Sequence, residues 1–429
     1  MNIDLSKILH RLLCIYAFLI PFEHILKKWF SIDTILKPYR FLAILSIAVF
    51  SFMMTRNRSL RIRTDFQQDI FLYAMVIYGL LISLFYMITT PFSLGRFYNE
   101  LFQLVLYLGV FFTIKNSDFS KQQLYQILYS LLVGVFLNSI YVFYNFYVLA
   151  DYTRPKGYMD NPNFLALSVA VTIIVFVKKI DEVKGIVRWG LLFALPFMLY
   201  IFIISGSRTA SGSLLVAALL LLVFLSSKAK ILFLFSVVAL STFVLTTRKI
   251  AGPNVLLERI RERDATKDPR IYLWKGVIAA SEKTNYVGLG LGQFEARFPS
   301  LYQNENHYQI REAVQFGYYL SAHSDYFAIL ITYGIVGLVS FILFLYTSTR
   351  KVVLALLFYK QKEKRSFFEL QLILLAALVV FGIASENLGN ALYWLLLAFA
   401  TKSITFLESK TQKLQNQPTA NLLHEDTIG

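Results

Sequence analysis

His323 is the residue of this sequence best placed to do chemistry. It precedes a long apolar run in AHSDYFAILITYGIVGL (residues 322–338), and it is one of only five histidines in the chain. A neutral imidazole can take a proton from a hydroxyl group near neutral pH. The alternative is a structural histidine at the mouth of a helix, bonded to a backbone carbonyl or to a lipid headgroup. Which of the two holds depends on the charged groups beside it.

Two arginines have neighbours suited to binding an anion. Arg208 ends a predicted span within IISGSRTASGS, where small residues leave room for a bulky anion and Ser207 adds a hydroxyl donor. Arg270 follows Pro269 at a predicted helix start, and a helix N-terminus combined with an arginine favours a phosphate. The alternatives are a helix-end arginine that snorkels toward headgroups and a plain surface arginine.

Two loops have structural interpretations. RPKGYMDNPNFLA (residues 154–166) leads into a span, where Asn161 and Asn163 can cap the helix and Arg154 adds a cation. VGLGLGQF (residues 287–294) is not a nucleotide-binding loop, because no predicted strand precedes it and neither glycine-rich nucleotide fingerprint is matched. Tight turns at the membrane surface are expected there instead.

The elements that must position these residues are membrane helices. Hydrophobic residues make up 57% of the 429 positions and charged residues 16%, against about a quarter charged in soluble proteins. Since about 20 apolar residues cross a bilayer core, the chain is predicted to be an all-α polytopic membrane protein with about twelve transmembrane helices. The first is predicted to be a retained helix and not a signal peptide. The predicted spans are residues 8–22, 39–54, 70–90, 98–114, 124–149, 163–177, 189–205, 211–227, 231–247, 325–346, 367–385 and 388–405.

Charge predicts the orientation of these spans. Loops rich in Lys and Arg, such as TRNRSLRIRTD and KKIDEVKGIVR, alternate with loops that carry few cations, and basic short loops mark the cytoplasmic side. Both termini are then cytoplasmic, and His323, Arg208 and Arg270 share the opposite face. Like-charge repulsion from two guanidinium groups would keep the imidazole neutral there. One basic outer segment, residues 23–40, disagrees: it is either an interfacial amphipathic segment or a sign that the first span is misplaced.

Composition also narrows the partners. The net charge of +16 is largely accounted for by the basic inner loops, so no nucleic-acid partner is predicted. Cys14 is the only cysteine, which excludes an intramolecular disulfide and a thiolate metal site. The outer loops show no carboxylate cluster, so neither a metal nor a cofactor is predicted.

One long polar segment interrupts the apolar runs. Ile271, Trp274 and Ile278 recur at helical spacing within it and predict two or three helices lying on the membrane face. The predicted organisation is transmembrane helices 1–9 in residues 1–247, a large extracytoplasmic, partly helical loop holding the donor and acceptor site in residues 248–322, transmembrane helices 10–12 in residues 323–405 and a flexible cytoplasmic tail in residues 406–429.

The order of these motifs resembles the O-antigen ligase and polymerase superfamily of bacterial integral membrane glycosyltransferases (GT-C-like). SGSRTA is followed by a large outer loop with R…YLW and GLGLGQF, and then by HSDY…YGIVGL, and the resemblance covers about residues 154–345. It implies a glycan donor carried on undecaprenyl pyrophosphate and, in the ligase branch, a lipid A core oligosaccharide as acceptor. It also implies a periplasmic active site in the bacterial inner membrane, in contact with membrane lipids.

Family roles carry over onto matching positions. The resemblance implies that His323 is the catalytic base and that Arg208 and Arg270 bind the donor pyrophosphate. Glu386, in ASENLGN between the last two spans, is the nearest match to an acidic residue that ligases tend to have. Ser324 stands where many relatives have Asn, which puts in doubt a role for that neighbour. Two further candidate supporting residues, chosen from their positions, are Arg154 and Ser207.

The predicted function is an O-antigen ligase that is inverting and independent of metal. The main alternative is a repeat-unit polymerase of O-antigen or capsule from the same superfamily, whose acceptor is another lipid-linked repeat unit. A transporter of lipid-linked glycans is disfavoured, because transporters carry ionisable residues inside their spans and the middles of these spans are nearly free of them. A non-catalytic scaffold would make His323 dispensable.

Overall fold

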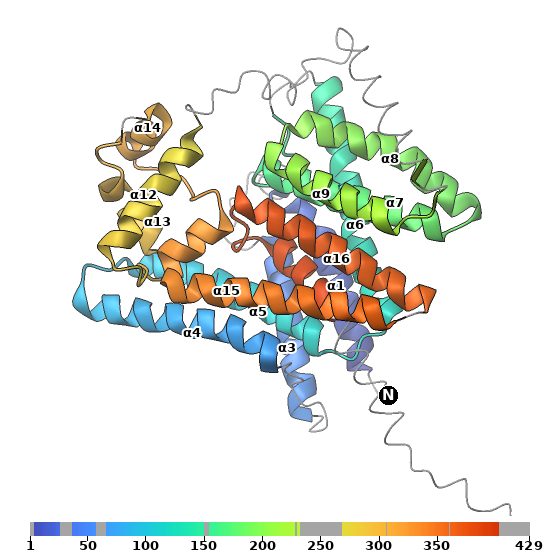
Figure 1. The fold of residues 1–429 in the computed structure, drawn as a ribbon, viewed down its shortest axis with the longest axis horizontal. Coiled ribbons are helices and arrows are strands. Elements are labelled where there is room, and N and C mark those ends of the chain that lie inside the picture. The colour runs from blue at the N-terminus through green and yellow to red at the C-terminus, as the bar shows by residue number, and fades with distance from the viewer. Residues whose placement is uncertain are drawn as a thin grey trace, which may run out of the picture.

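The computed structural model describes residues 4–25, 37–56, 66–149, 154–227, 230–231, 268–305, 307–359 and 361–402. Within these ranges the regular structure is helical and no strand occurs (Figure 1). Nine of the described helices are long and apolar enough to cross a membrane, and two shorter apolar helices, Arg208–Phe224 and Ala391–Lys402, accompany them. The chain is therefore an all-α polytopic membrane protein, as its composition predicts.

The described helices follow the predicted spans in order. They are α1 (Leu5–Leu19) with the short 3-10 helix η1 (Ile20–Phe22), α3 (Pro38–Arg56), α4 (Phe66–Thr89), α5 (Leu94–Asn116), α6 (Lys121–Tyr147), α7 (Pro162–Glu182), α8 (Gly185–Ser205), α9 (Arg208–Phe224), α12 (Pro269–Lys283), α13 (Gln293–Leu301), α14 (Tyr308–Phe316), α15 (Asp325–Phe358) and α16 (Lys362–Ile383). Eleven of the twelve predicted spans coincide with one of these or with Ala391–Lys402. The ninth, residues 231–247, lies outside the described residues except for its first position.

The predicted placement of Arg208 and one predicted span boundary are wrong. α8 ends at Ser205, Gly206 follows in the left-handed conformation with φ of 62°, and Ser207 is the N-cap of α9. Arg208 is therefore the first residue of the next helix and not the outer end of the preceding span. α15 continues to Phe358, well past its predicted end at residue 346, because the stretch that was assigned to a basic loop contains the apolar run VVLALLF.

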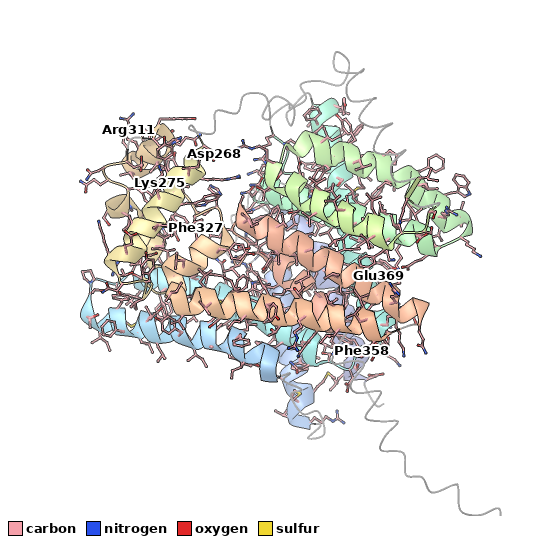
Figure 2. The ribbon with its side chains drawn as sticks, in the orientation of Figure 1. Asp268, Lys275, Arg311, Phe327, Phe358 and Glu369 are labelled. Carbon is pink, nitrogen blue, oxygen red and sulfur yellow. The ribbon has the colours of Figure 1, made fainter. Side chains whose placement is uncertain are left out.

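Polar contacts between distant segments gather at two ends of the helix bundle. At one end the Thr209 hydroxyl donates to the Ala384 carbonyl at 3.2 Å, and at the other the Lys178 ammonium donates to Glu369 at 2.6 Å. Figure 2 shows the same separation, with Asp268 at the first end and Glu369 at the second. We call the first the site end, because it holds the predicted site residues. The described basic stretch KKIDEVKGIVR, which begins at Lys178, starts at the opposite end.

The three helices α12, α13 and α14 form a group at the site end, beyond the start of α15 (Figure 1). They are the described helices of the predicted outer loop, whose residues 248–267 lie outside the described residues. They share a hydrophobic core with the first turns of α15, formed by Leu273, Val277, Ala280, Leu289, Phe294, Phe298, Tyr302, Ile310, Ala313, Ala322, Ala328 and Ile331.

The predicted apolar stripe of α12 is in the wrong register. Ile271 and Ile278 are 37% and 39% exposed, whereas Leu273 and Val277 are fully buried. Both stripes have helical spacing, and spacing alone does not decide which of two adjacent faces meets the core. Trp274, the third residue of the predicted stripe, is half-buried because it packs toward the segment before α15.

α15 is interrupted in its first half by Gly334, which has a φ of 64° and a ψ of −169°. A break of this kind frees backbone groups that a bilayer cannot solvate, so they need partners within the protein. Residues 286–290 supply these partners through three backbone hydrogen bonds: Leu289 N to Ile331 O (2.8 Å), Gly290 N to Thr332 O (3.0 Å) and Ile335 N to Tyr286 O (2.8 Å).

The glycines of VGLGLGQF explain how this segment fits against the helix. Gly288, Gly290 and Gly292 all have positive φ, between 71° and 96°. A Cβ atom on Gly288 would lie 2.5 Å from the backbone nitrogen of Gly334. The segment is therefore more than the surface turn expected from the sequence, since it pairs with a broken membrane helix at close backbone contact.

Candidate functional site

Arg208 and Arg270 stand at the N-termini of two helices that Asp268 joins. Arg208 begins α9, and Arg270 is the second residue of α12. Asp268 is the N-cap of α12: its Oδ1 accepts the Arg270 amide at 3.1 Å, and its Oδ2 lies 3.1 Å from Nη2 of Arg208. Asp268 projects from the α12 group toward α9 (Figure 2). Two helix N-termini and two guanidinium groups together favour an anion.

His323 lies just before α15 in a backbone conformation that is unusual for its residue type. Its φ of 51° is in the left-handed region, which costs a non-glycine residue about 1 kcal/mol. Its Nδ1 lies 3.3 Å from Oγ of Ser321, and Nε2 has no hydrogen-bond partner among the described residues. The interpretation of His323 as a structural residue expects a hydrogen bond from the imidazole to a backbone carbonyl or to a lipid headgroup. No such bond to a backbone carbonyl occurs among the described residues.

The charge state of His323 follows from its surroundings. Its pKa is lowered to about 4, first by burial and then by the positive charge of Arg270, while Asp268 acts in the opposite direction. The imidazole is neutral near pH 7, as predicted. The predicted cause was repulsion from two guanidinium groups, and it is only half right. Burial lowers the pKa most, and Arg270 is the one guanidinium that contributes.

The segment that carries His323 is held from two sides through Ala322. The Ala322 amide donates to Oε2 of Glu386 at 3.0 Å, and its carbonyl accepts from the indole N–H of Trp274 at 2.9 Å. The Trp274 ring stacks on Phe327 with 5.1 Å between ring centroids. Glu386 therefore bonds the backbone next to the histidine, which makes it a positioning residue in this structure.

The loop after α16 is tied to the start of α15. Asp325 accepts from the backbone amide of Asn387 and from the side-chain Nδ2 of Asn387, the latter at 2.9 Å, and the Ser324 hydroxyl donates to the Gly382 carbonyl at 3.3 Å.

Burial raises the pKa of Glu386 to about 8, and the charge of Asp325 adds to this. Glu386 is therefore mostly protonated at neutral pH.

Arg154 and Ser207 join the N-terminal end of α7 to the N-terminal end of α9. Arg154 donates from Nε to the Ser205 carbonyl at 2.7 Å and from Nη2 to Oδ1 of Asn163 at 2.6 Å, and the Ser207 hydroxyl donates to the same Asn163 oxygen at 2.9 Å. These contacts fix the turn that carries Arg208. A direct contact of Arg154 or Ser207 with the donor stays a prediction.

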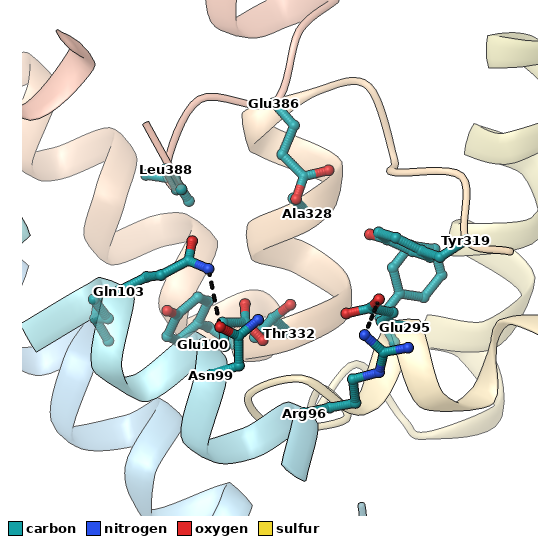
Figure 3. A pocket seen from close by; sticks show the side chains of 14 residues that line it. Arg96, Asn99, Glu100, Gln103, Glu295, Tyr319, Ala328, Thr332, Glu386 and Leu388 are labelled. Atoms are coloured by element: carbon teal, nitrogen blue, oxygen red, sulfur yellow. Dashed lines mark hydrogen bonds and ion pairs between the residues drawn. The ribbon is translucent and has the colours of Figure 1, made fainter. Parts of the chain in front are cut away.

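A polar cavity of about 170 Å³ lies beside the histidine segment, between α5, α13, α15 and the loop after α16 (Figure 3). In this view Glu386 points into it from the top and Tyr319 from the right, and Arg96 at its edge pairs with Glu295 at 2.6 Å. The complete lining is Arg96, Asn99, Glu100, Gln103, Leu104, Phe294, Glu295, Tyr319, Ala328, Thr332, Tyr333, Glu386, Leu388 and Gly389. Neither Arg208 nor Arg270 belongs to it.

One group of potential metal ligands occurs at the site end in the part of the chain that the structure describes. Glu23, His24 and Asp160 bring their ligand atoms within 4.8 Å of one another. The Lys37 ammonium contacts Glu23 and lies 3.1 Å from Asp160, so a cation of the chain already lies between the two carboxylates. This network neutralises part of the basic segment 23–40 and ties α1 to the loop before α7.

Two features of the site were missed from the sequence. Asp268 carried a recognisable pattern, because an Asp directly before a Pro at a helix start is a common N-cap. The cavity carried none, since Glu100, Glu295 and Glu386 are far apart in sequence and only the packing of α5, α13 and the last loop brings them to one cavity.

Comparison with known proteins gives one family match. No curated protein matches the chain. A family model described as O-antigen ligase matches residues 193–342. The matched segment contains Arg208, Arg270 and His323 and ends before Glu386. Residues 193–342 are therefore similar to the O-antigen ligase family, over about a third of the chain.

Proposed function

We propose that the protein is an O-antigen ligase of GT-C-like type. It transfers a polysaccharide from undecaprenyl pyrophosphate to a sugar of the lipid A core, at the periplasmic face of the bacterial inner membrane. The observation that carries the proposal is the pair of arginine-bearing helix N-termini that Asp268 joins beside the neutral imidazole of His323. Such a site offers positive charge to a pyrophosphate leaving group and a base to an attacking hydroxyl. The family match supports the same class of reaction.

The transfer is a displacement at the anomeric carbon of the donor sugar. The oxygen of the acceptor hydroxyl forms the new bond to this carbon while the bond to the pyrophosphate oxygen breaks, and the electron pair leaves with the pyrophosphate. The hydroxyl proton passes to Nε2 of His323, and general-base catalysis of this kind contributes about 10²–10⁴ in rate. When Nδ1–H donates to Ser321, Nε2 is the basic nitrogen. A direct displacement inverts the anomeric centre.

Arg208 and Arg270 stabilise the charge that develops on the pyrophosphate. Arginines that bind phosphoryl groups in other enzymes contribute about 10³–10⁵ to turnover. To reach Arg208, the donor displaces Oδ2 of Asp268, while Oδ1 can keep capping α12. The incoming negative charge also raises the pKa of His323, so the base becomes stronger once the donor is bound.

A repeat-unit polymerase of the same superfamily would share these groups and differ in its acceptor. The two are separated by gel profiles of lipopolysaccharide from a deletion strain. A ligase predicts complete loss of polymer from lipid A, with polymer still present on its lipid carrier. Single repeat units on lipid A would instead assign the chain as a polymerase.

The chemistry itself is tested with purified protein, donor and acceptor. His323→Ala is expected to abolish transfer, by about 10²–10⁴ per folded molecule, while donor binding persists. The matched control is His307→Ala, which replaces a buried histidine that stacks on Tyr308 in the same outer loop. Equal and mild losses in both variants would show that His323 is structural. Transfer is also expected to persist in excess chelator, and loss that magnesium or manganese restores would overturn the role given to the two arginines.

A further inference from the structure

We propose that the cavity beside the histidine segment binds one sugar ring of the acceptor. The proposal rests on the proposed function, and it adds a location and a set of residues for a substrate that the arginines do not serve. It depends on the size of the cavity, on the polarity of its lining and on its connection to the backbone of the histidine segment.

The size of the cavity fits a single ring. Its volume is about 170 Å³, and an engineered protein cavity of about 150 Å³ holds one benzene molecule. A lipid chain or a long oligosaccharide would not fit inside. An acceptor placed there would insert its terminal ring and leave the rest of its chain outside.

The lining selects a neutral, hydroxyl-rich ligand over an anion. Three carboxyl groups face the cavity, from Glu100, Glu295 and Glu386, and Arg96 is the one basic residue of the lining, paired with Glu295. A pyrophosphate would find no unpaired cation in this lining, because Arg96 is already paired with Glu295, and it is better served at Arg208. Carboxyl oxygens accept hydrogen bonds from hydroxyl groups, and a side-chain amide such as that of Gln103 both donates and accepts.

Aromatic side chains complete the lining. Phe294, Tyr319 and Tyr333 add apolar ring area, with a phenolic hydroxyl on two of the three. Gln103 and Asn99 stand one turn apart on α5, with the Gln103 Nε2 3.3 Å from the Asn99 Oδ1 (Figure 3). This combination of apolar faces and convergent polar groups is typical of a small-molecule site.

The cavity and the base share one piece of backbone. Glu386 faces the cavity and holds the Ala322 amide at 3.0 Å, one residue before His323. Tyr319 lines the cavity from the chain that leads to the same histidine. A ring in the cavity therefore lies beside the segment that carries His323, and in the proposed reaction its hydroxyl would have to approach the donor carbon from the face opposite to the pyrophosphate. Displacement with inversion requires that geometry.

The test compares two Gln→Leu variants in transfer assays. Gln103→Leu removes the amide from the cavity with little change in volume, and Gln303→Leu makes the same change at an exposed position after α13. Gln103→Leu is expected to raise the KM for the acceptor about tenfold, the effect of losing hydrogen bonds to a bound ligand, with the KM for the donor unchanged. Gln303→Leu should change neither. An unchanged acceptor KM in Gln103→Leu, or equal shifts in both variants, would overturn the proposal.

A binding measurement separates this proposal from the proposed function. Saturation-transfer NMR with core oligosaccharide released from lipid A is expected to show binding to the wild-type protein and to Gln303→Leu but not to Gln103→Leu. Binding that depends on Gln103 in a protein without transfer activity would support the cavity and refute the ligase. A released O-antigen repeat unit that binds in place of the core oligosaccharide would support the cavity and assign a polymerase. Transfer activity without Gln103-dependent binding of either sugar would refute the cavity alone.

Discussion

At the scale of single residues, His323 combines a low proton affinity with a task that requires a base. Burial and Arg270 lower its pKa to about 4, so the empty enzyme keeps the imidazole neutral across the physiological range. A pyrophosphate bound at Arg208 and Arg270 would add negative charge nearby and raise that pKa. The base would then gain strength only when its reaction partner is in place.

This dependence predicts different pH profiles for kcat/KM and kcat. The ratio kcat/KM reports the free enzyme, and its acid limb is expected at a pKa of about 4. The acid limb of kcat reports the donor complex and is expected at higher pH. An unfolded histidine takes up its proton at about pH 6.5 and the folded one only near 4, so His323 makes the folded state lose stability as pH falls through this window. Rates must therefore be normalised to folded protein, and coincident limbs near 6.5 would contradict the buried base.

A second residue-scale prediction concerns the guanidinium of Arg208. Arg208→Ala is expected to raise the donor KM about tenfold or more and to lower kcat by about 10³, because the contact forms before displacement and strengthens during it. Arg208→Lys should recover part of both losses, since an ammonium keeps the charge but not the two parallel hydrogen bonds. The control is Arg311→Ala on the exposed face of α14. Full recovery with lysine would show that charge alone is needed.

The sequence predicted much of this site at the level of residue types. His323, Arg208 and Arg270 were chosen by motif and topology, and Asp268 brings the two arginines together beside the histidine. Sequence could not show that Glu386 acts through the Ala322 amide, because a bond to a backbone group leaves no pattern in residue identity. The same holds for the Trp274 indole on the Ala322 carbonyl.

At the scale of elements, the broken helix α15 is the feature that most constrains the fold. Its break at Gly334 lies next to the segment 286–290, so a loop from the outer helices becomes part of the membrane bundle. The same segment connects α12 to α13. Any change at the break should therefore affect folding before it affects chemistry.

Gly334→Ala tests this. A Cβ at this position would lie 2.2 Å from the Val287 carbonyl oxygen, and the positive φ adds strain, so we expect a loss of about 1–3 kcal/mol in unfolding free energy. Gly190→Ala in α8 is the control, because a Cβ there meets nothing within 4 Å and alanine is the better helix former by about 1 kcal/mol. Thermal melting of both variants in the same detergent gives the comparison. An undiminished midpoint for Gly334→Ala would mean that the break is dispensable.

The positions of the membrane helices were predictable wherever the hydrophobicity of the sequence determines them. Asn161 caps α7 by accepting the Asn163 amide at 2.8 Å, as its position before the span predicts. The break in α15 was not predictable, because a lone glycine in an apolar run is compatible with an unbroken helix. The register of α12 was wrong for a related reason, since the choice between Ile271 and Leu273 depends on which side faces α15.

At the scale of the whole molecule, the difference in charge between the two polar ends predicts the orientation of the protein in the membrane. Lys178 and Lys402 lie at one end, and the site lies at the other. Basic short loops face the cytoplasm in bacterial membrane proteins. We therefore expect the site end to be periplasmic.

Reporter fusions check this orientation. A reporter that is active only outside the cytoplasm should work when fused after Gln303, between α13 and α14, and fail when fused after Lys362, at the start of α16. The same two fusions with a reporter that is active only in the cytoplasm should give the opposite result and serve as the control. A reversed pattern would place His323 in the cytoplasm and remove the basis of the proposed function.

Asp268 has a consequence for the end of each catalytic cycle. Its Oδ2 is the anion that occupies Arg208 when the site is empty, and its Oδ1 stays anchored to α12. A pyrophosphate that binds Arg208 would therefore replace the carboxylate of Asp268 as its counter-ion. The net electrostatic gain of binding is then the difference between the arginine–pyrophosphate and the arginine–carboxylate ion pairs. Under the proposed function, the spent lipid carrier would leave more readily for the same reason, because the returning carboxylate would replace it. Two arginines alone would hold such a product, whereas Asp268 beside them would favour its release and the recycling of the carrier.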